Sequence, residues 1–143
     1  MGLVRVGVFA GFEQQVRELH GDPGAVLRTV GLSEDYFASH HEDDFMSYDL
    51  AKSILHEAAL ATACPHFAAL LGARHDMGVM GAVGYLMQQS NDVRTALREL
   101  SEHHSFRVKD ASRVDSGVIG EQAFISYYDY NSAELSGYSA EVA

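Results

Sequence analysis

The feature that most constrains the fold is a change in the spacing of apolar residues near His103 and His104. Before this point apolar residues recur at steps of three and four, which is the period of an amphipathic helix. After it apolar and polar residues alternate, and β-branched and aromatic residues become frequent, which is typical of strands. We therefore expect an α+β fold, in which a helical N-terminal two-thirds packs against a C-terminal antiparallel β-hairpin or sheet.

The expected helix starts are marked by proline or by side chains that cap helices. Asp22-Pro23 combines an N-cap acceptor with proline at the first helical position. Ser47 and Asp92 are placed to cap two further helices, and Pro65 restarts the chain after a break. An amphipathic stretch from Phe9 to Leu19 predicts one more helix at the N-terminal end.

The segment Gly78–Met87 is apolar on all sides, which predicts a buried helix. Glycine inside a helix costs about 1 kcal/mol relative to alanine. We expect Gly81 and Gly84 to offset this cost by letting a neighbouring backbone approach closely.

The alternating C-terminal region predicts a hairpin. Its first strand is expected to contain Phe106 and Val108, and its turn is expected at Asp115-Ser116-Gly117, before a second strand from Val118 to Tyr130. A lone hairpin is marginally stable and exposes its edges, so more chain or a partner is expected beyond the polar segment 131–136.

Composition and charge narrow the class of protein. A chain of 143 residues is expected to form one domain, and its one cysteine excludes an internal disulfide. We therefore expect a cytoplasmic protein. With 10 Lys and Arg against 20 Asp and Glu, the net charge of −10 argues against direct binding to nucleic acid or to an anionic membrane. No signal peptide or membrane span is evident.

No pattern in the sequence predicts catalysis, so we assign no catalytic residue, metal or cofactor. The run His40–Asp44 is the densest group of candidate metal ligands, but consecutive side chains point in different directions, and a solvated acidic loop is the better interpretation. Cys64 lies in an apolar setting without a thiol motif, which indicates a small buried hydrophobe. Neither a phosphate-binding loop nor a nucleophile elbow is present.

Four segments occur in a characteristic order: Asp22–Leu32, Ala61–Arg74, Asp76–Tyr85 and Ser90–Leu97. This order resembles the N-terminal effector-binding domain of AraC-type transcription regulators, within the subgroup of ornithine-utilisation and VirS-like activators. The resemblance runs from about Phe9 to Tyr130. It departs from the family at Phe67-Ala68-Ala69, where Phe-Gly-Leu is common, and at Ser90–Val93, where Ser-Pro-Thr-Leu is common.

This resemblance implies a non-enzymatic sensor. Residues 1–143 are expected to form a single effector-sensing domain that is incomplete, with the DNA-binding helix-turn-helix domain absent. The implied partners are a small-molecule effector and, only through that absent domain, DNA; a homodimer stays open. The alternative is a module for dimerisation or partner docking that binds no ligand, and an enzyme that uses the histidine-rich segments is a third, weakly supported reading.

We expect the effector to bind between the Gly78–Met87 helix and the inner face of the hairpin. The predicted contacts are Met80, Tyr85, Phe106 and Tyr127. A flexible methionine suits varied apolar ligands, and two phenols could orient one polar group. The competing interpretation is that all four side chains are ordinary core residues.

Overall fold

The computed structural model describes residues 2–130 of the chain. Helices dominate the described part, and strands form a small sheet and a long hairpin, so the predicted α+β class is confirmed. The α-helices are α1 (Phe12–Glu18), α2 (Pro23–Thr29), α3 (Tyr36–Ser39), α4 (Tyr48–Ala61), α5 (Phe67–Ala73), α6 (Ala82–Gln88) and α7 (Val93–His103). Short 3-10 helices are η1 (Val6–Phe9), η2 (Met77–Met80) and η3 (His104–Phe106).

The predicted helix caps are confirmed. The Asp22 carboxylate accepts a hydrogen bond from the Gly24 N–H at 2.9 Å, with Pro23 in the first turn of α2. The Asp92 carboxylate accepts from the Thr95 N–H at 2.7 Å, and the Ser47 hydroxyl accepts from the Leu50 N–H at a longer 3.4 Å. Each cap satisfies a backbone donor that the helix itself leaves unpaired, which fixes where the helix begins.

Apolar side chains of α1 to α5 and of the small sheet form the main core. Ile54 of α4 and Leu27 of α2 are completely buried in it. Aromatic rings extend the core, because Phe12 packs edge-on against Phe67 with ring centroids 5.7 Å apart and Phe9 stacks on Phe37 at 4.9 Å. Cys64 is buried in the same core, which confirms its interpretation as a small hydrophobe.

A three-stranded antiparallel sheet joins the two halves of the molecule. Its order is β2 (Phe45–Ser47), β1 (Leu3–Arg5) and β3 (Val108–Lys109), so it brings together strands from distant parts of the sequence. Val4 pairs with Met46 on one side and with Val108 on the other. All three of these side chains are buried, so one face of the sheet contributes to the main core.

The hairpin is formed by β4 (Ser112–Ile119) and β5 (Gln122–Asp129), and its turn is not where the sequence pattern predicted. The chain reverses at Gly120 and Glu121, with Gly120 at φ +62°. Glycine adopts this left-handed conformation without steric cost, as a tight hairpin turn requires. The predicted turn residues lie inside β4, where Gly117 pairs with Phe124 and leaves room for its ring. The polar segment 131–136 lies outside the described residues.

The first predicted strand is also wrong in its pairing. Phe106 belongs to η3, and Val108 pairs with β1 of the small sheet instead of with the hairpin. Asp110 follows β3 at φ +53° and ends the alternation, so a new strand begins at Ser112.

The single buried helix predicted over Gly78–Met87 is wrong, because the segment is divided into η2 and α6. Gly81 separates them with φ +57°, a conformation that no α-helix can contain. Tyr85 and Leu86 of α6 are exposed, so the segment is not buried on all sides. The expected close approach of a backbone is confirmed at Gly84, where an added Cβ atom would lie 2.0 Å from the Met77 carbonyl oxygen. At Gly81 the expectation is wrong, because the nearest atoms belong to the Arg5 side chain.

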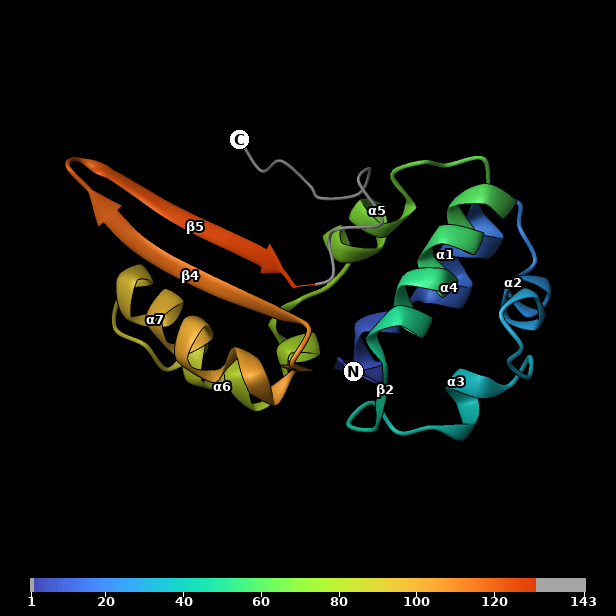
Figure 1. Cartoon of the computed structure of the whole chain (residues 1–143), viewed down its shortest axis with the longest axis horizontal. Helices are drawn as coiled ribbons and strands as arrows, with labels where there is room; N and C mark the ends of the chain where they lie inside the picture. Colours follow the sequence, from blue (N-terminus) through green and yellow to red (C-terminus); the bar gives the residue numbers. More distant parts are fainter. Residues whose placement is uncertain (1, 131–143) are drawn as a thin grey trace.

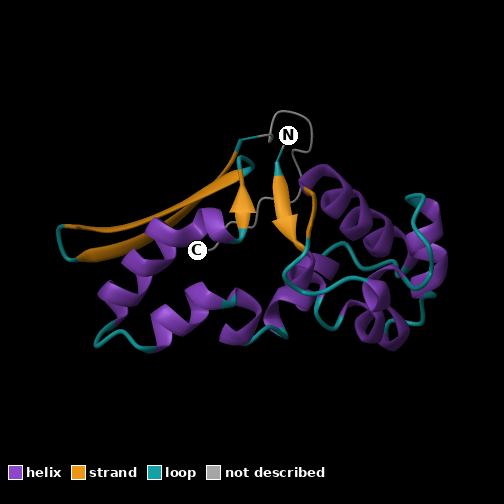
Figure 2. Ribbon diagram, turned by 90° about the horizontal axis from the view of Figure 1, so that it is seen from below, coloured by secondary structure: helices purple, strands orange, loops and turns teal. Residues whose placement is uncertain are grey.

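The elements are arranged as two groups beside the small sheet. Helices α1 to α5 gather on one side, and the hairpin projects to the other side with α6 and α7 beneath it (Figure 1). Helix α7 packs against both β4 and α6, so it lies between the hairpin and α6 (Figure 2). Among residues 2–130, no helix combines the length and the apolar composition that crossing a membrane requires.

Candidate functional site

The four predicted ligand contacts lie on four different elements, η2, α6, η3 and β5. Tyr85 is 65% exposed on α6, Phe106 is 66% exposed and stacks on the His103 ring, and Met80 is partly buried at the end of η2. Tyr127 lies on β5, on the far side of α7 from Tyr85. Because α7 fills the space between α6 and the hairpin, no described hydrogen bond or ring contact joins any two of the four.

Tyr127 instead belongs to a polar junction between the hairpin and the start of α4. Its hydroxyl lies 2.8 Å from the Tyr48 hydroxyl. The edge of the His104 ring faces Tyr127, with centroids 6.3 Å apart, and His104 Nε2 lies 2.9 Å from the Ser112 hydroxyl. Tyr48, Tyr127, His104 and Ser112 thus connect four separate elements, α4, β5, η3 and β4, and we call them the polar junction.

Burial keeps this junction uncharged. Burial, and then the hydrogen bond with Tyr127, raises the pKa of the Tyr48 phenol, so it stays protonated at neutral pH. Burial, and then the nearby Arg107 guanidinium, lowers the pKa of His104, so its imidazole is neutral. His104 is only 6% exposed, and its Nδ1 atom has no hydrogen-bond partner among the described residues.

The face of the small sheet that points away from the core carries positive charge. Arg5 and Arg107 lie opposite each other on β1 and at the edge of β3, because the Arg5 N–H donates to the Arg107 carbonyl oxygen at 3.1 Å. Lys109 shares this face and places its Nζ atom 4.2 Å from the centroid of the Phe45 ring. We call Arg5, Arg107 and Lys109 the basic sheet face.

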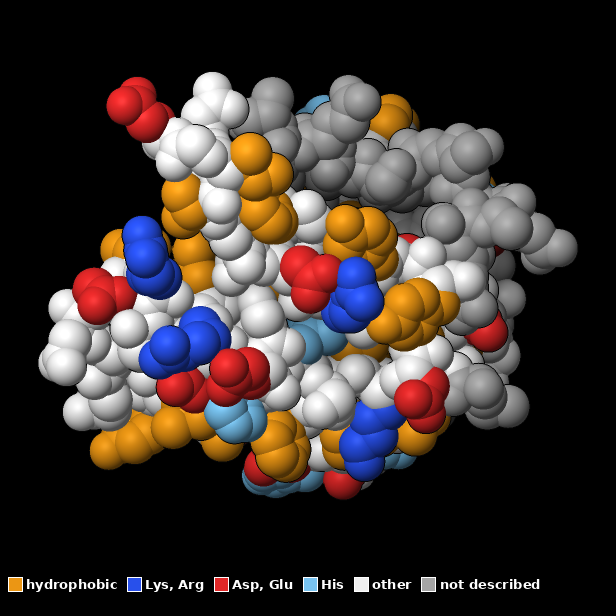
Figure 3. All heavy atoms as spheres, turned by 60° about the vertical axis from the view of Figure 1, so that its left-hand side comes forward, with side chains coloured by type: hydrophobic (Ala, Val, Ile, Leu, Met, Phe, Trp, Pro, Cys, Tyr) orange, Lys and Arg blue, Asp and Glu red, His pale blue; other side chains and the backbone are white. Residues whose placement is uncertain are grey.

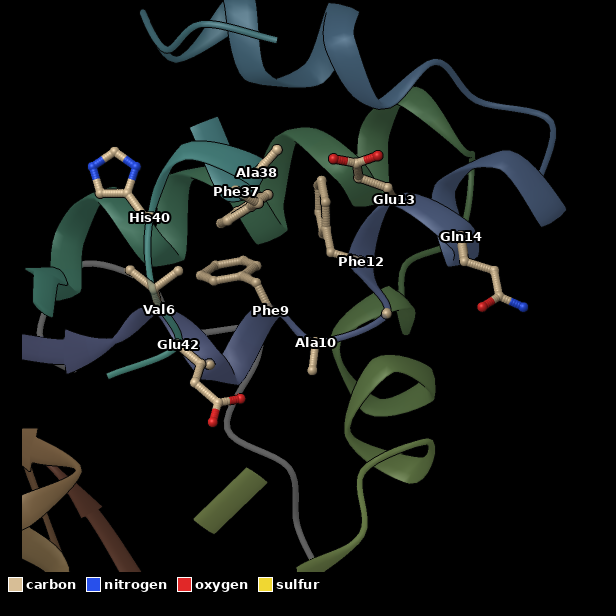
Figure 4. A pocket seen from close by; sticks show the side chains of 12 residues that line it. Val6, Phe9, Ala10, Phe12, Glu13, Gln14, Phe37, Ala38, His40 and Glu42 are labelled. Carbon is tan, nitrogen blue, oxygen red and sulfur yellow. The ribbon is translucent and has the colours of Figure 1, made fainter. Parts of the chain in front are cut away.

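A separate apolar cleft of about 400 Å³ opens beside η1 and α3. The rings of Phe9, Phe12 and Phe37 form its floor, and Figure 4 shows the polar side chains of Glu13, Gln14, His40 and Glu42 around its rim. An apolar floor with a few polar groups at the rim is typical of small-molecule sites. This cleft can enclose an apolar group and contact a polar or cationic one.

The acidic residues with ligand potential already have partners. In the histidine-rich run, Asp43 forms an ion pair with Arg5, and the Asp44 carboxylate accepts from the His41 N–H at 2.8 Å. Glu99, Glu102 and His103 place one possible ligand atom each within 4.8 Å of one another, but His103 Nδ1 already lies 3.2 Å from the Glu99 carboxylate. These groups therefore stabilise turns and helix ends.

Neither the basic sheet face nor the apolar cleft was predicted from the sequence. The alternation Leu3-Val4-Arg5-Val6 was a signal for a strand, but the segment is short and its partners are far away in the sequence. The cleft combines residues of η1, α1 and α3, whose relative placement is set by core packing. Neither arrangement follows from spacing along one element.

The family model for the N-terminal arabinose-binding domain of AraC transcription regulators matches residues 21–141. The chain belongs to this family, and the resemblance is thereby confirmed at the level of the family. No curated protein matches the chain.

Proposed function

We propose that this domain binds a small-molecule effector and thereby controls a DNA-binding helix-turn-helix domain attached to it. The observation that carries this proposal is the family match over residues 21–141. The net charge of −10 agrees with a division of labour in which another domain contacts DNA. The proposal includes a cytoplasmic location, membership of the ornithine-utilisation and VirS-like subgroup, and residues 1–143 as one sensing unit.

The apolar cleft supports effector binding. Its volume of about 400 Å³ lies in the usual range for small-molecule sites, roughly 300 to 1,000 Å³. Among the four contacts predicted from the sequence, Tyr127 has the best support, because its hydroxyl is held by Tyr48 beside the basic sheet face. Direct contact of Met80, Tyr85 and Phe106 with the effector stays part of the proposal.

The test is a thermal-shift screen of the chain against small metabolites. A ligand at a hundred times its dissociation constant is expected to stabilise the fold by about 2.7 kcal/mol. Ala38→Phe adds a ring to the wall of the apolar cleft, whereas Ala69→Phe adds the same ring to an exposed position of α5. Loss of ligand stabilisation in the first variant alone assigns the effector to the cleft, and equal stabilisation in both moves it elsewhere.

The alternative function is a dimerisation or partner-docking module without a ligand. The hairpin favours it, because Ile119 is 74% exposed and Ile125 is 60% exposed. Apolar side chains are also visible on the projecting part of the surface (Figure 3). Two results together would favour this alternative. The screen would identify no ligand, and analytical ultracentrifugation would show a dimer that Ile125→Lys dissociates.

A further inference from the structure

The outer face of the small sheet holds more positive charge than its surroundings neutralise. Val4, Met46 and Val108 point into the core, so the alternation of side chains places Arg5 on the opposite face. Arg107 directly precedes β3 and lies beside Arg5, because the Arg5 N–H donates to the Arg107 carbonyl oxygen and the Arg5 charge lowers the pKa of Arg107. Two like charges held close together repel each other. Such a pair therefore needs compensating negative charge.

Among residues 2–130, ion pairs supply that compensation to only one of the two arginines. Arg5 forms an ion pair with Asp43, and its side chain is only 12% exposed. Arg107 is partly buried, yet within residues 2–130 no carboxylate forms an ion pair with its guanidinium and no group accepts a hydrogen bond from it. Burial and then Arg5 lower the pKa of Arg107, which shows the same lack of compensation.

Hydrogen-bond donors lie beside this uncompensated guanidinium. Tyr127 is near enough to Arg107 to raise its pKa, and the Tyr127 hydroxyl is 2.8 Å from that of Tyr48. In a hydroxyl pair one O–H donates to the other oxygen, so the second O–H remains free to donate to a third group. Guanidinium and phenol donors are together the groups that bind the oxygens of an anion.

The geometry also holds Arg5 in place. Its guanidinium packs against Gly81, where a Cβ atom would lie 2.2 Å from Arg5 Nη1. The absence of a side chain at Gly81 therefore gives the Arg5 guanidinium room beside η2. Arg107 thus has a donor of β1, Arg5, and a donor of β5, Tyr127, in its neighbourhood.

We propose that Arg107 and Arg5, with the Tyr127–Tyr48 hydroxyl pair, bind the oxyanion of a carboxylate- or phosphate-bearing small molecule. This inference rests on the proposed function, because it gives the effector an anionic group and binds that group at the basic sheet face instead of in the apolar cleft. The anion accepts hydrogen bonds from the Arg107 guanidinium and from the free phenol O–H, and it neutralises the charge that Arg5 and Arg107 share. An anionic effector also suits a chain whose remaining surface is acidic, because this face is where it would be attracted.

The test measures anion binding to the full 143-residue chain by thermal shift and by NMR titration. Inorganic phosphate and succinate are titrated separately at constant ionic strength, with chloride as the reference. Both anions are expected to bind more strongly than chloride. The ratio of their dissociation constants tells whether phosphate or carboxylate is preferred. Arg107→Gln is expected to weaken binding about tenfold or more.

Arg113→Gln is the matched control, because Arg113 also lies on a strand of this half but already pairs with Asp115 at 2.6 Å. It should leave anion binding unchanged. Arg107→Lys, which keeps the charge and loses the planar fork, should give an intermediate affinity. Because removing a repulsive charge can itself raise the melting temperature, the dissociation constant decides the result.

Equal effects of phosphate, succinate and chloride, or equal affinities of the Arg107→Gln and Arg113→Gln variants, would overturn the inference. These outcomes are distinct from failure of the proposed function. A metabolite screen that yields an effector insensitive to Arg107→Gln supports the function and refutes the anion site. If the screen identifies no effector but phosphate binding depends on Arg107, the proposed function is refuted. The anion site then serves another role.

Discussion

Gly84 of α6 offers a sharp test of the packing, because a single methyl group should be harmful there. A Cβ atom at this position would lie 2.0 Å from the Met77 carbonyl oxygen and 3.0 Å from Met80 Cβ. Ordinary contact begins near 3.4 Å, so the backbone of η2 would have to move by more than an ångström. A backbone carbonyl cannot rotate away as the end of a flexible side chain can.

Two opposing contributions set the magnitude for Gly84→Ala. Alanine gains about 1 kcal/mol over glycine in helix propensity. Overpacking costs about 1 to 3 kcal/mol, and contact with backbone places the cost at the upper end. The net expectation is a loss of about 2 kcal/mol, which lowers the melting temperature by about 8 °C for a domain of this size.

Gly72→Ala is the matched control. Gly72 also lies in a short helix, α5, but an added Cβ atom meets nothing within 4 Å. The variant should therefore gain up to about 1 kcal/mol from propensity alone. Urea denaturation followed by circular dichroism gives both values, and a stability gain of equal size in the two variants would refute the packing of η2 against α6.

Three further predictions follow from the caps, the buried histidine and the junction. Asp22→Ala should cost about 1 kcal/mol of unfolding free energy, because the Gly24 N–H loses its acceptor; calorimetry measures this, and an unchanged melting temperature would contradict the cap. Because the folded state lowers the pKa of His104, the unfolded state binds more protons below about pH 6.5. The stability that His104 contributes is therefore fully present above that pH and falls on acidification, and urea midpoints from pH 5 to 8 should fall less steeply in His104→Gln. Tyr127→Phe removes one hydroxyl of the junction and should weaken binding of an anionic effector by about 1 kcal/mol in titration calorimetry, whereas Tyr128→Phe should not.

Features set by neighbouring residues were predictable from the sequence. The caps at Asp22, Ser47 and Asp92 each depend on a side chain and a backbone N–H two or three residues later. Such local hydrogen bonds form wherever the spacing allows, so a linear pattern identifies them. The change of period near His104 similarly marked where helices give way to strands.

Features set by contacts between distant parts of the chain were not predictable from the sequence. Asp115-Ser116-Gly117 has the composition of a turn, but pairing of Gly117 with Phe124 keeps the strand extended there. The strands β1 and β2 contain three residues each, too few for a period to be recognised. The basic sheet face depends on pairing of β1 with β3, which follows the last helix. No spacing within one segment of the sequence reveals such a pairing.

The position of the basic sheet face explains how an anion bound there would affect the whole domain. Val83 and Val114 are buried on the hairpin side but do not belong to the main core, so the described residues of the two halves do not form one continuous apolar interior. They are joined by the small sheet and by the polar junction, in which Tyr48 contacts Tyr127. A ligand shifts a conformational equilibrium only by its difference in affinity for the two states. An anion that contacts both Arg5 and Tyr127 would bind two such states with different affinities, because any movement of the hairpin relative to β1 changes the distance between these two donors.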